Sequence, residues 1–290
     1  MTITFINHEQ AMTIKKFLQK QGISHRLYQK LKILPQNFLV GQTRAAGNAI
    51  LPHNAQVQLQ LPPEADDPKV LTSYQPLTVI YEDDNWLVVD KPIQLSSVPG
   101  PSNRQDTLVN RIKGHLKQQH AQGLVPHLIT RLDFDTQGLV LVAKNLLANS
   151  LANQQVMKHQ LVKFYYARVA GTLKQDHDVI NAPIGPVAGQ IARHVRPDGQ
   201  SAQTEYWVLE RSVNQTLVKV QLHTGRTHQI RVHFASLGHP LLGDQLYGGP
   251  QNVGFSHQAL QAYYLAFYDS LTHQWRHFEI PNRLILNNYG

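Results

Sequence analysis

The stretch "TRLDFDTQGLVLVAKN", residues 130–145, joins a charged segment to an almost wholly apolar run. The apolar run predicts a buried strand. A turn before it accounts for Asp135 and Thr136, whose side chains are expected to bond the local backbone. Arg131 and Asp133 stand just upstream, on alternate positions of an extended segment, and the turn does not explain them. The stretch therefore predicts a reactive or binding group at the mouth of a buried strand.

Further strand-like runs dominate the chain from Leu77 on, and helical patterns are fewer. The runs read "LTVIYE", "WLVVDKP", "KFYYARVAG", "TEYWVLE", "LVKVQLHTG" and "AYYLAFYD". The clearest helix is "DTLVNRIKGHL", in which Asp106 is the expected N-cap and apolar residues recur every four positions. Strands interrupted irregularly by one or two helices are typical of the α+β class. We expect a mixed, largely antiparallel sheet rather than a doubly wound one.

The N-terminal part is set apart by its charge. Residues 10–63 contain seven basic side chains and no acidic one, a local excess that indicates a working surface. The runs "MTIKKFLQKQG" and "SHRLYQKLK" predict two short helices, the first ending at Gly22 and the second capped by Ser24. A solvated helical face is the alternative explanation. The candidate RNA-binding residues on these helices are Lys15, Lys16, Arg26, Lys30 and Lys32.

A polar, proline-rich stretch separates this part from the rest. It reads "PPEADDPKVLTSYQP", residues 62–76, and is the predicted linker. The runs "NFLVGQ" and "AQVQLQLP" before it alternate apolar and polar residues, which predicts strands around turns. We therefore expect a small α/β module in residues 1–70 and a larger domain in residues 71–290.

The composition narrows the class of partner. The formal charge of +8 and the pI near 9.6 favour polyanions, most often nucleic acid. Cysteine is absent, which removes disulfides, thiolate nucleophiles and thiolate zinc sites and fits a reducing interior. The first ten residues do not form a signal-peptide core, and no apolar run approaches the ~20 residues of a membrane helix. We expect a cytoplasmic protein that does not bind a membrane.

Two metal hypotheses arise from the sequence. Asp133 and Asp135 form a D-x-D pair, which can hold a nucleotide-sugar diphosphate through a divalent ion, but no phosphate-cradling glycine loop lies nearby. Four histidines also lie close together: His223, His228, His233 and His239. In a strand, the first and third would share one face and the second would take the other. No zinc-binding spacing appears, so we expect satisfied or solvent-facing histidines and no metal.

Two further segments combine polar groups with turns or aromatic rings. "LHTGRTHQIRVHFASLGHPLLGDQLYGG", residues 222–249, offers Arg226 and Arg231 as planar donors for a carboxylate or phosphate, with Gln229 between them. "KFYYARVAG" places its two tyrosines on opposite faces of a strand. One ring is expected in the core, and the other is a candidate for stacking on a nucleobase.

Together these segments resemble the RluA family of pseudouridine synthases. "RLDFDTQGLVLVAKN", "KFYYARVAG" and "HTGRTHQIRVHFASLGHPLLGDQLYG" occur in the order and spacing of that family. "VIYEDDNWLVVDKPIQLSSVPG" and "AQTEYWVLER" look like the same family, so that the resemblance runs from Leu77 to the C-terminus. The N-terminal part resembles, by pattern, the small S-four-like RNA-binding domain named after a ribosomal protein.

The resemblance implies roles for individual residues. The catalytic aspartate of the family falls on Asp133, its active-site tyrosine on Tyr165, and the arginine that pairs with the aspartate on Arg231. Arg131 falls on the arginine implicated in handling the extruded nucleotide, and Lys163 precedes the tyrosine. The expected substrate contacts are Arg131, Lys163, Arg226 and Gln229. Many relatives have histidine where this chain has Thr130 and Gln261.

The implied reaction breaks the bond from uracil nitrogen to ribose, turns the base and rejoins it through carbon. It needs no redox step and adds no group, so no cofactor is expected. An ionised carboxylate can attack the sugar or the ring, or remove a sugar proton, and all three routes stay open. The base must leave folded RNA at a cost of a few kcal/mol. Stacking on Tyr165, worth ~1–3 kcal/mol, would recover much of that.

These features predict a monomeric pseudouridine synthase that acts on ribosomal or transfer RNA. Two alternatives come from other classes. One is a non-catalytic RNA-binding or ribosome-assembly protein built on an inactive synthase fold, against which Asp133, Tyr165 and Arg231 argue together. The other is a metal-dependent nucleotide-sugar transferase that uses Asp133 and Asp135.

Overall fold

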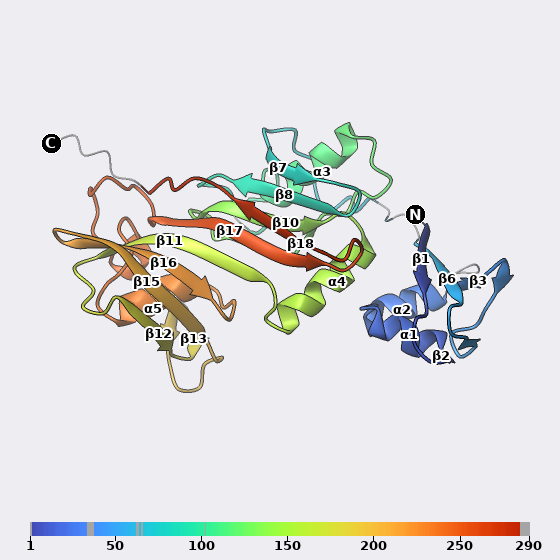
Figure 1. Cartoon of the computed structure of the whole chain (residues 1–290). Coiled ribbons are helices and arrows are strands. Elements are labelled where there is room, and N and C mark those ends of the chain that lie inside the picture. The colour runs from blue at the N-terminus through green and yellow to red at the C-terminus, as the bar shows by residue number, and fades with distance from the viewer. Residues whose placement is uncertain (1, 34–37, 62–63, 65, 102, 285–290) are drawn as a thin grey trace.

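The protein has an α+β fold in which a small N-terminal module lies beside a large twisted sheet (Figure 1). The computed structural model describes residues 2–33, 38–61, 64, 66–101 and 103–284 of the 290-residue chain. Of the helices in this part of the chain, none combines the length and the apolar character required to cross a membrane.

The N-terminal module contains a four-stranded antiparallel sheet in the order β1-β6-β3-β4, with a short β2–β5 pair beside it. Its elements are β1 (Thr2–Ile6), β2 (Met12–Thr13), α1 (Ile14–Lys20), α2 (His25–Lys32), β3 (Phe38–Val40), β4 (Thr43–Arg44), β5 (Ile50–Leu51) and β6 (Gln56–Gln60). Both predicted helices are confirmed. Gly22 follows α1 with a φ of +91°, and the Ser24 hydroxyl accepts from the N–H of Leu27 at the start of α2.

The large domain is built on a ten-stranded sheet in the order β12-β15-β16-β11-β17-β10-β8-β7, with β18 beside β17 and β9 beside β10. Its elements are β7 (Thr78–Glu82), β8 (Trp86–Lys91), α3 (Leu108–Gln118), β9 (His127–Leu128), β10 (Gln137–Ala143), α4 (Leu146–Met157), β11 (Val162–Ala170), β12 (His177–Asn181), β13 (Ile184–Pro186), β14 (Arg193–Val195), β15 (Gln203–Ser212), β16 (Gln215–Leu222), α5 (Gln229–Ser236), the 3-10 helix η1 (Gln245–Tyr247), β17 (Leu260–Asp269) and β18 (Gln274–Glu279). In the described residues β10 pairs in parallel with β17, and the other strand pairs are antiparallel. This confirms the predicted mixed, largely antiparallel sheet.

The apolar run of β10 is buried on both faces of the sheet. Val140 and Val142 pack in the cluster that contains apolar residues of α3 and α5. Leu139 and Leu141 point to the opposite face and pack in the cluster that contains Ala148 of α4. A strand covered on both sides reads as a continuous apolar run, because neither face meets water. Residues that precede such a strand are therefore attached to a rigid element.

Helix α3 begins one residue later than predicted. Its N-cap is Thr107, whose hydroxyl accepts from the N–H of Asn110 while the Asn110 side chain accepts from the N–H of Thr107. Asp106, the predicted cap, instead accepts two hydrogen bonds from the Arg111 guanidinium, at 2.8 and 2.7 Å. The prediction was wrong because a guanidinium one turn along the helix competes for the carboxylate, and the adjacent threonine can serve as the cap.

The predicted linker lies along α3. Positions 62, 63 and 65 of the linker, like position 37 of a predicted strand, are outside the described residues. Further on, the ammonium of Lys113 donates to the carbonyl of Asp67 at 2.8 Å, and the Asn110 amide donates to that of Leu71 at 2.6 Å. Backbone groups of this stretch are therefore held by helix side chains rather than left to solvent.

The N-terminal module packs on α4 of the large domain. Leu147 and Leu151 of α4 belong to the same apolar cluster as Phe17 and Leu27 of the module. The hydroxyl of Ser150 accepts from the N–H of Ser24 at 2.8 Å and donates to the carbonyl of Gly22 at 3.1 Å. Removing the module would therefore expose apolar residues of α4, so its role is better tested by substitution than by truncation.

Gly138→Ala is expected to destabilise the protein by about 3 kcal/mol. Gly138 pairs with Ala262 where β10 meets β17, and it has a φ of +119°. An added Cβ would lie 2.1 Å from the carbonyl oxygen of Ala262, in a conformation that side chains rarely adopt. Urea unfolding measures the loss. Gly100→Ala is the control, since its Cβ would meet nothing within 4 Å; equal midpoints for the two variants would contradict the prediction.

Candidate active site

Asp133 lies in the segment that leads into β10, and hydrogen bonds hold the residues on both sides of it. The Ser97 hydroxyl donates to the carbonyl of Leu132 at 2.6 Å and accepts from its N–H at 3.1 Å. The ammonium of Lys91 donates to the carbonyl of Phe134 at 3.1 Å. The Asp133 side chain is 28% exposed. Its carboxylate therefore projects from a fixed backbone towards solvent.

The turn next to Asp133 differs from the predicted one. The carbonyl of Asp133 accepts from the N–H of Thr136 at 3.1 Å, so the turn closes earlier than expected. The Asp135 carboxylate lies 3.4 Å from the ring of His257, and the Thr136 hydroxyl accepts from Gln258 at 3.3 Å. The predicted bonds from these side chains to the local backbone are wrong, because the segment before β17 lies alongside and provides other partners.

Arg231 joins Asp133 to a second carboxylate. It lies on α5, and its Nη1 donates to Asp133 Oδ2 at 3.1 Å. Its Nε and Nη2 donate to the two oxygens of Asp244 at 2.7 and 2.9 Å. Burial alone would lower the pKa of Arg231, but the hydrogen bonds to Asp244 and the charges of both carboxylates raise it. Since Asp244 is 1% exposed, it anchors the guanidinium, which offers a further N–H to Asp133.

Tyr165 approaches the same place from β11. Its ring is 6% exposed and belongs to the main apolar cluster. Tyr166 points to the other face and stacks on Tyr263 with ring centroids 3.7 Å apart, as expected for neighbours in a strand. Burial, and then the charge of Asp133, raise the pKa of the Tyr165 hydroxyl. The hydroxyl therefore stays protonated at neutral pH and is available as a donor.

Asp133, Tyr165 and Arg231 surround an inner slot that adjoins a larger cleft. The slot has a volume of about 60 Å³, and the cleft, which Asp133 and Tyr165 also line, has about 510 Å³. A cleft of this size suits a nucleotide, whereas the slot has room for about two waters. A nucleotide in the cleft would therefore place only its reacting edge at the slot.

Three of the predicted substrate contacts line this cleft. Arg131 is exposed at its rim, and Lys163 lies inside it, where burial lowers the pKa of the lysine. Arg226 contributes from the turn before α5, and its Nε donates to the carbonyl of Ser201 at 2.9 Å. Gly225 leaves space there, since the nearest atom to an added Cβ would be the Lys163 ammonium at 3.8 Å. The cleft therefore carries basic side chains at its rim and beside Gly225, where a phosphate or a base could bind.

Gln229, the fourth predicted substrate contact, uses its whole amide within the protein. Its oxygen accepts from the hydroxyl of Thr224 at 2.8 Å and the N–H of Arg226 at 2.9 Å. Its nitrogen donates to the carbonyl of Gln203 at 2.9 Å and the hydroxyl of Thr204 at 3.0 Å. An amide group offers two donors and two acceptor lone pairs, so none remains for a ligand. This geometry indicates that Gln229 shapes the turn that carries Arg226.

The segment that carries the four histidines is not a strand, so the face assignment that would hold for a strand does not apply. β16 ends at Leu222 and α5 begins at Gln229, because glycine and a left-handed residue at His228 (φ 57°) turn the chain between them. His223 accordingly pairs with Glu205 at 2.7 Å. Within the residues that the structure describes, no group of three or more His, Cys, Asp or Glu side chains could hold a metal ion. The two carboxylates of the D-x-D pair have separate partners: Arg231 contacts Asp133, and His257 lies 3.4 Å from Asp135.

Sequence reasoning missed three groups near Asp133. Asp244 and Tyr247 come from "GDQLYG" and were not among the predicted site residues. The centroid of the Tyr247 ring lies 5.0 Å from the Arg231 guanidinium. His228 was expected to be satisfied or solvent-facing and was not selected as a site residue; its Nε2 lies 3.9 Å from Asp133 Oδ2. A polar residue between closely spaced glycines was the available signal for the first two, and nothing in the sequence separated His228 from its neighbours.

Thr130 and Gln261, the two departures noted from the family's usual pattern, both make structural hydrogen bonds. The Thr130 hydroxyl accepts from the N–H of Leu141 at 2.9 Å. The Gln261 amide donates to the carbonyl of Pro281 and accepts from the N–H of Arg283, each at 2.8 Å. One side chain secures β10, and the other attaches the C-terminal segment to β17.

Lys91→Met is expected to lower the free energy of unfolding by about 2–4 kcal/mol, because it leaves three carbonyls without their donor. The fully buried ammonium donates to Pro92 at 2.8 Å, Leu95 at 2.7 Å and Phe134 at 3.1 Å. Burial lowers the pKa of Lys91 to about 8. The folded protein therefore binds fewer protons than the unfolded chain from pH 8 upwards, so this residue makes stability rise with pH up to the ordinary lysine pKa. Urea unfolding at pH 7 and pH 10 tests this sign; a difference between wild type and variant that stays constant with pH would contradict it.

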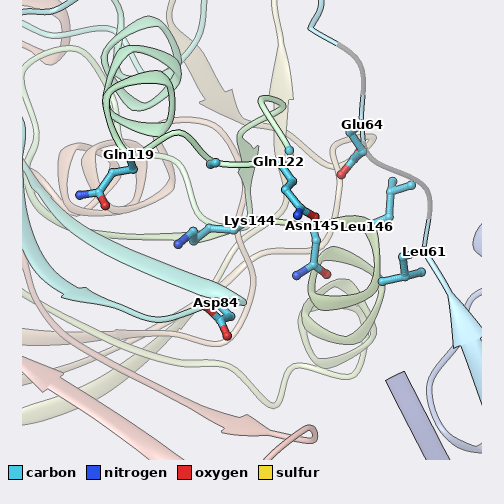
Figure 2. A pocket seen from close by; sticks show the side chains of 10 residues that line it. Leu61, Glu64, Asp84, Gln119, Gln122, Lys144, Asn145 and Leu146 are labelled. Atoms are coloured by element: carbon cyan, nitrogen blue, oxygen red, sulfur yellow. The ribbon is translucent and has the colours of Figure 1, made fainter. Parts of the chain in front are cut away.

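A separate cavity of about 400 Å³ lies where the N-terminal module, α3 and α4 meet (Figure 2). Two of its charged side chains have partners: Lys144 pairs with Glu82 at 2.8 Å, and Glu64 contacts His127 at 2.9 Å. Asn145 caps α4 by accepting from the N–H of Ala148 at 2.9 Å. These groups hold the junction together, and we assign the cavity no catalytic part.

The predicted RNA contacts of the N-terminal module lie apart from Asp133. They are exposed on α1 and α2 and do not line the slot or the cleft; they are Lys15, Lys16, Arg26, Lys30 and Lys32. Lys15 and Lys32 line a hollow of about 470 Å³ beside Tyr28, with the Lys15 ammonium 5.9 Å from that ring. The module therefore presents a second basic surface, on elements that carry no part of the slot.

Comparison with known proteins places this geometry in a family. Residues 85–236 match the family described as RNA pseudouridylate synthase. An uncharacterized RNA pseudouridine synthase of Bacillus subtilis (strain 168), YjbO, is 37% identical over 273 residues, which cover 93% of this chain and 95% of that protein. The ribosomal large subunit pseudouridine synthase D of Nitrosomonas europaea is 41% identical over 177 residues, 60% of this chain and 50% of that protein. The solved structure of human RNA pseudouridylate synthase domain containing 1 matches with a TM-score of 0.59 and 24% identity, over 74% of this chain and 86% of that one, and supports the fold.

The sheet, the cleft and these matches define an enzyme of the isomerase class that acts on uridine in RNA. The chain belongs to the RNA pseudouridylate synthase family. The predicted function, pseudouridine formation in RNA, is thereby confirmed.

Proposed function

We propose that Asp133 is the catalytic carboxylate of this synthase and that Tyr165 and Arg231 complete its active site. The observation that carries the proposal is the hydrogen bond from Arg231 to Asp133, between residues 98 positions apart, at the junction of slot and cleft. A carboxylate beside a cleft of nucleotide size is paired with a buried guanidinium, which holds it in position. Tyr165 forms the wall against which the base lies, with its protonated hydroxyl as a donor.

The chemistry requires no group from outside the protein and the RNA. The bond from uracil N1 to the sugar breaks, the base turns, and a bond from uracil C5 to the same sugar carbon forms. The proton displaced from C5 is matched by a proton gained at N1, so atoms and electrons balance without a redox partner. The ionised Asp133 starts this sequence as a nucleophile or as the base for a sugar proton. Arg231 remains bonded to Asp244 throughout and keeps the carboxylate in place.

The remaining cleft residues bind the extruded nucleotide. Arg131, exposed at the rim, takes the place that the base vacates or holds a backbone phosphate. Lys163 and Arg226 supply further charge inside the cleft, where both line the wall beside Gly225. Gln229 acts through the turn before α5, which it holds with four hydrogen bonds.

Ribosomal RNA is the proposed substrate. The relative in Nitrosomonas europaea is named a ribosomal large subunit pseudouridine synthase, which supports this choice over transfer RNA. Pseudouridine mapping of both RNA classes, from cells with and without this gene, tests it. We expect at least one ribosomal site to disappear without the gene and to return with it, whereas loss confined to transfer RNA would contradict the proposal. The proposal includes a monomeric protein in the cytoplasm. The absence of cysteine agrees with the reducing interior of a cell.

The proposal also assigns residues 1–70 as an S-four-like RNA-binding domain and residues 71–290 as the catalytic domain. Support comes from the separate sheet of the N-terminal part and from its exposed basic side chains on two adjacent helices. These cations lie away from the slot, so they would bind RNA that flanks the modified uridine. Phosphate contacts of this kind position an RNA without reading its bases.

Replacing Lys15, Lys16, Lys30 and Lys32 together by glutamine is expected to weaken RNA affinity and to flatten its salt dependence. Each phosphate contact contributes roughly 0.7–0.9 to the slope of log affinity against log salt, so the slope should fall by about 3. Titrations of a ribosomal RNA fragment at several salt concentrations provide the measurement. A set of four exposed glutamines of the large domain, changed to alanine, controls for the number of substitutions. An unchanged slope would refute the assignment.

A further inference from the structure

A second set of polar contacts, through Tyr247 and His228, leads to the carboxylate oxygen of Asp133 that Arg231 also contacts. The backbone N–H of Arg193 donates to the hydroxyl of Tyr247 at 2.8 Å. That hydroxyl lies 2.9 Å from Nδ1 of His228. The other ring nitrogen of His228 lies 3.9 Å from Asp133 Oδ2. His228 also lines the inner slot, so these contacts end at the reacting centre.

The backbone at His228 is held in an unusual conformation. It has a φ of +57° and occupies the N-cap position of α5, yet its side chain makes no capping hydrogen bond. The ring stands edge-on to that of Tyr247, at an angle of 86° and 5.8 Å between centroids. A left-handed, non-glycine residue that does not cap its helix is strained, and strain of this kind concentrates at functional sites. In this conformation the ring of His228 lies with Nε2 3.9 Å from Asp133 Oδ2.

These contacts select one form of the imidazole. A tyrosine hydroxyl has one hydrogen and two lone pairs, and the N–H of Arg193 occupies one lone pair. Among the residues that the structure describes, His228 Nδ1 is the acceptor in reach of the hydroxyl hydrogen. A neutral imidazole that accepts at Nδ1 carries its proton on Nε2. With the Tyr247 hydroxyl as donor to Nδ1, the N–H of His228 faces the carboxylate of Asp133.

We propose that His228 is a positioning residue for Asp133, with Tyr247 fixing the tautomer that presents Nε2–H to the carboxylate. The inference rests on the proposed role of Asp133. At 3.9 Å the contact is longer than a hydrogen bond, and such contacts often shorten when the substrate binds. Arg231 and His228 then hold one carboxylate oxygen from two directions, and the second oxygen is left for the sugar or the base.

The charges around His228 are consistent with a neutral ring. Burial lowers the pKa of His228; the carboxylates of Asp133 and Asp244 oppose this, and Arg231 and Arg193 reinforce it. Burial also raises the pKa of Tyr247, which keeps its hydroxyl hydrogen in place for Nδ1. The donor facing Asp133 is therefore present across neutral pH without protonation of the imidazole.

Two substitutions of His228 separate its side chain from its backbone. His228→Gln places an amide nitrogen near the position of Nε2, whereas His228→Asn reaches only to that of Nδ1. Asparagine, however, tolerates a left-handed conformation better than glutamine. We expect kcat of the Gln variant to stay within about threefold of wild type and that of the Asn variant to fall about tenfold, the effect of one lost hydrogen bond. RNA affinity should be unchanged in both, and a more active Asn variant would overturn the proposal.

Tyr247→Phe tests the tautomer. Without the hydroxyl, Nδ1 is free to take the proton, so a lone pair can face the carboxylate until acid supplies a second proton. We expect kcat to fall about tenfold at pH 8.5, the effect of one lost hydrogen bond, and this loss to become smaller towards pH 5, because burial places the pKa of His228 below its ordinary value. Tyr206→Phe is the matched control, since Tyr206 packs on Phe234 of the same helix at 5.4 Å and does not line the slot. A Tyr247→Phe variant impaired equally at all pH values would show a packing role only and overturn the proposal.

The turnover of an Asp133→Asn variant distinguishes the two levels of inference. Active Asp133→Asn enzyme would remove the proposed function and this inference together. Inactive Asp133→Asn enzyme, combined with a Tyr247→Phe pH profile parallel to wild type, would leave the proposed function intact and reject the role of His228 alone.

Discussion

Asp133→Asn is expected to lower turnover by about 10⁴-fold or more, the range seen when a catalytic nucleophile or base is removed. Asparagine has the shape of aspartate but neither attacks a sugar nor accepts a proton. Because the side chain is 28% exposed and Arg231 keeps its two bonds to Asp244, the variant is expected to fold. RNA affinity should stay within about threefold, since phosphate contacts supply most of it.

The measurement is single-turnover pseudouridine formation on a ribosomal RNA fragment, together with the affinity for the same fragment. Asp135→Asn is the matched control, because it removes an equal charge two residues away, from a side chain that turns to His257. It should keep activity within about threefold, as expected for a carboxylate outside the reacting centre. Undiminished turnover of the Asp133 variant would show that the carboxylate in the slot does not carry the reaction.

Arg231→Met is expected to lower the free energy of unfolding by about 3–5 kcal/mol and to abolish turnover. The side chain is 6% exposed and Asp244 is 1% exposed, so the substitution leaves a buried carboxylate without its partner. Asp133 loses its donor at the same time and is no longer aimed into the slot. Urea unfolding and single-turnover kinetics measure the two effects separately.

A double variant distinguishes the contribution of Arg231 to stability from its contribution to turnover. Arg231→Met combined with Asp244→Asn removes the unpaired charge, so most of the lost stability should return. Turnover should remain absent, because nothing restores the hydrogen bond to Asp133. Recovery of both stability and turnover would show that Arg231 is needed for folding alone.

Much of the fold follows from local pattern. "GLVLVA" predicts a strand because an apolar run of this length has no polar face to turn to water, and β10 is that strand. Ser24 predicts the start of α2 because its hydroxyl satisfies an N–H at the end of a helix. The N-cap of α3 was misplaced at Asp106, since the choice between neighbouring capping residues depends on Arg111 one turn away.

Less of the site follows from pattern alone. Asp133, Tyr165 and Arg231 were selected by resemblance to a family, and the structure brings all three to one slot. Asp244 and His228 were not selected, because their importance lies in contacts made by α5 and the loop after it. No local sequence pattern identifies a residue whose role is to hold another side chain in position.

The sequence by itself determined that the apolar run of β10 is buried, where α2 begins and that a charged turn precedes β10, because these depend on neighbours along the chain. Only the tertiary structure decided that Arg231 bridges Asp133 to Asp244 and that Tyr247 orients His228. Those contacts depend on how β10 and α5 are placed by the sheet between them. Hydrogen bonds act over about 3 Å, so whether two distant residues form one depends on how whole helices and strands pack, and the sequence spacing of the residues does not reveal it.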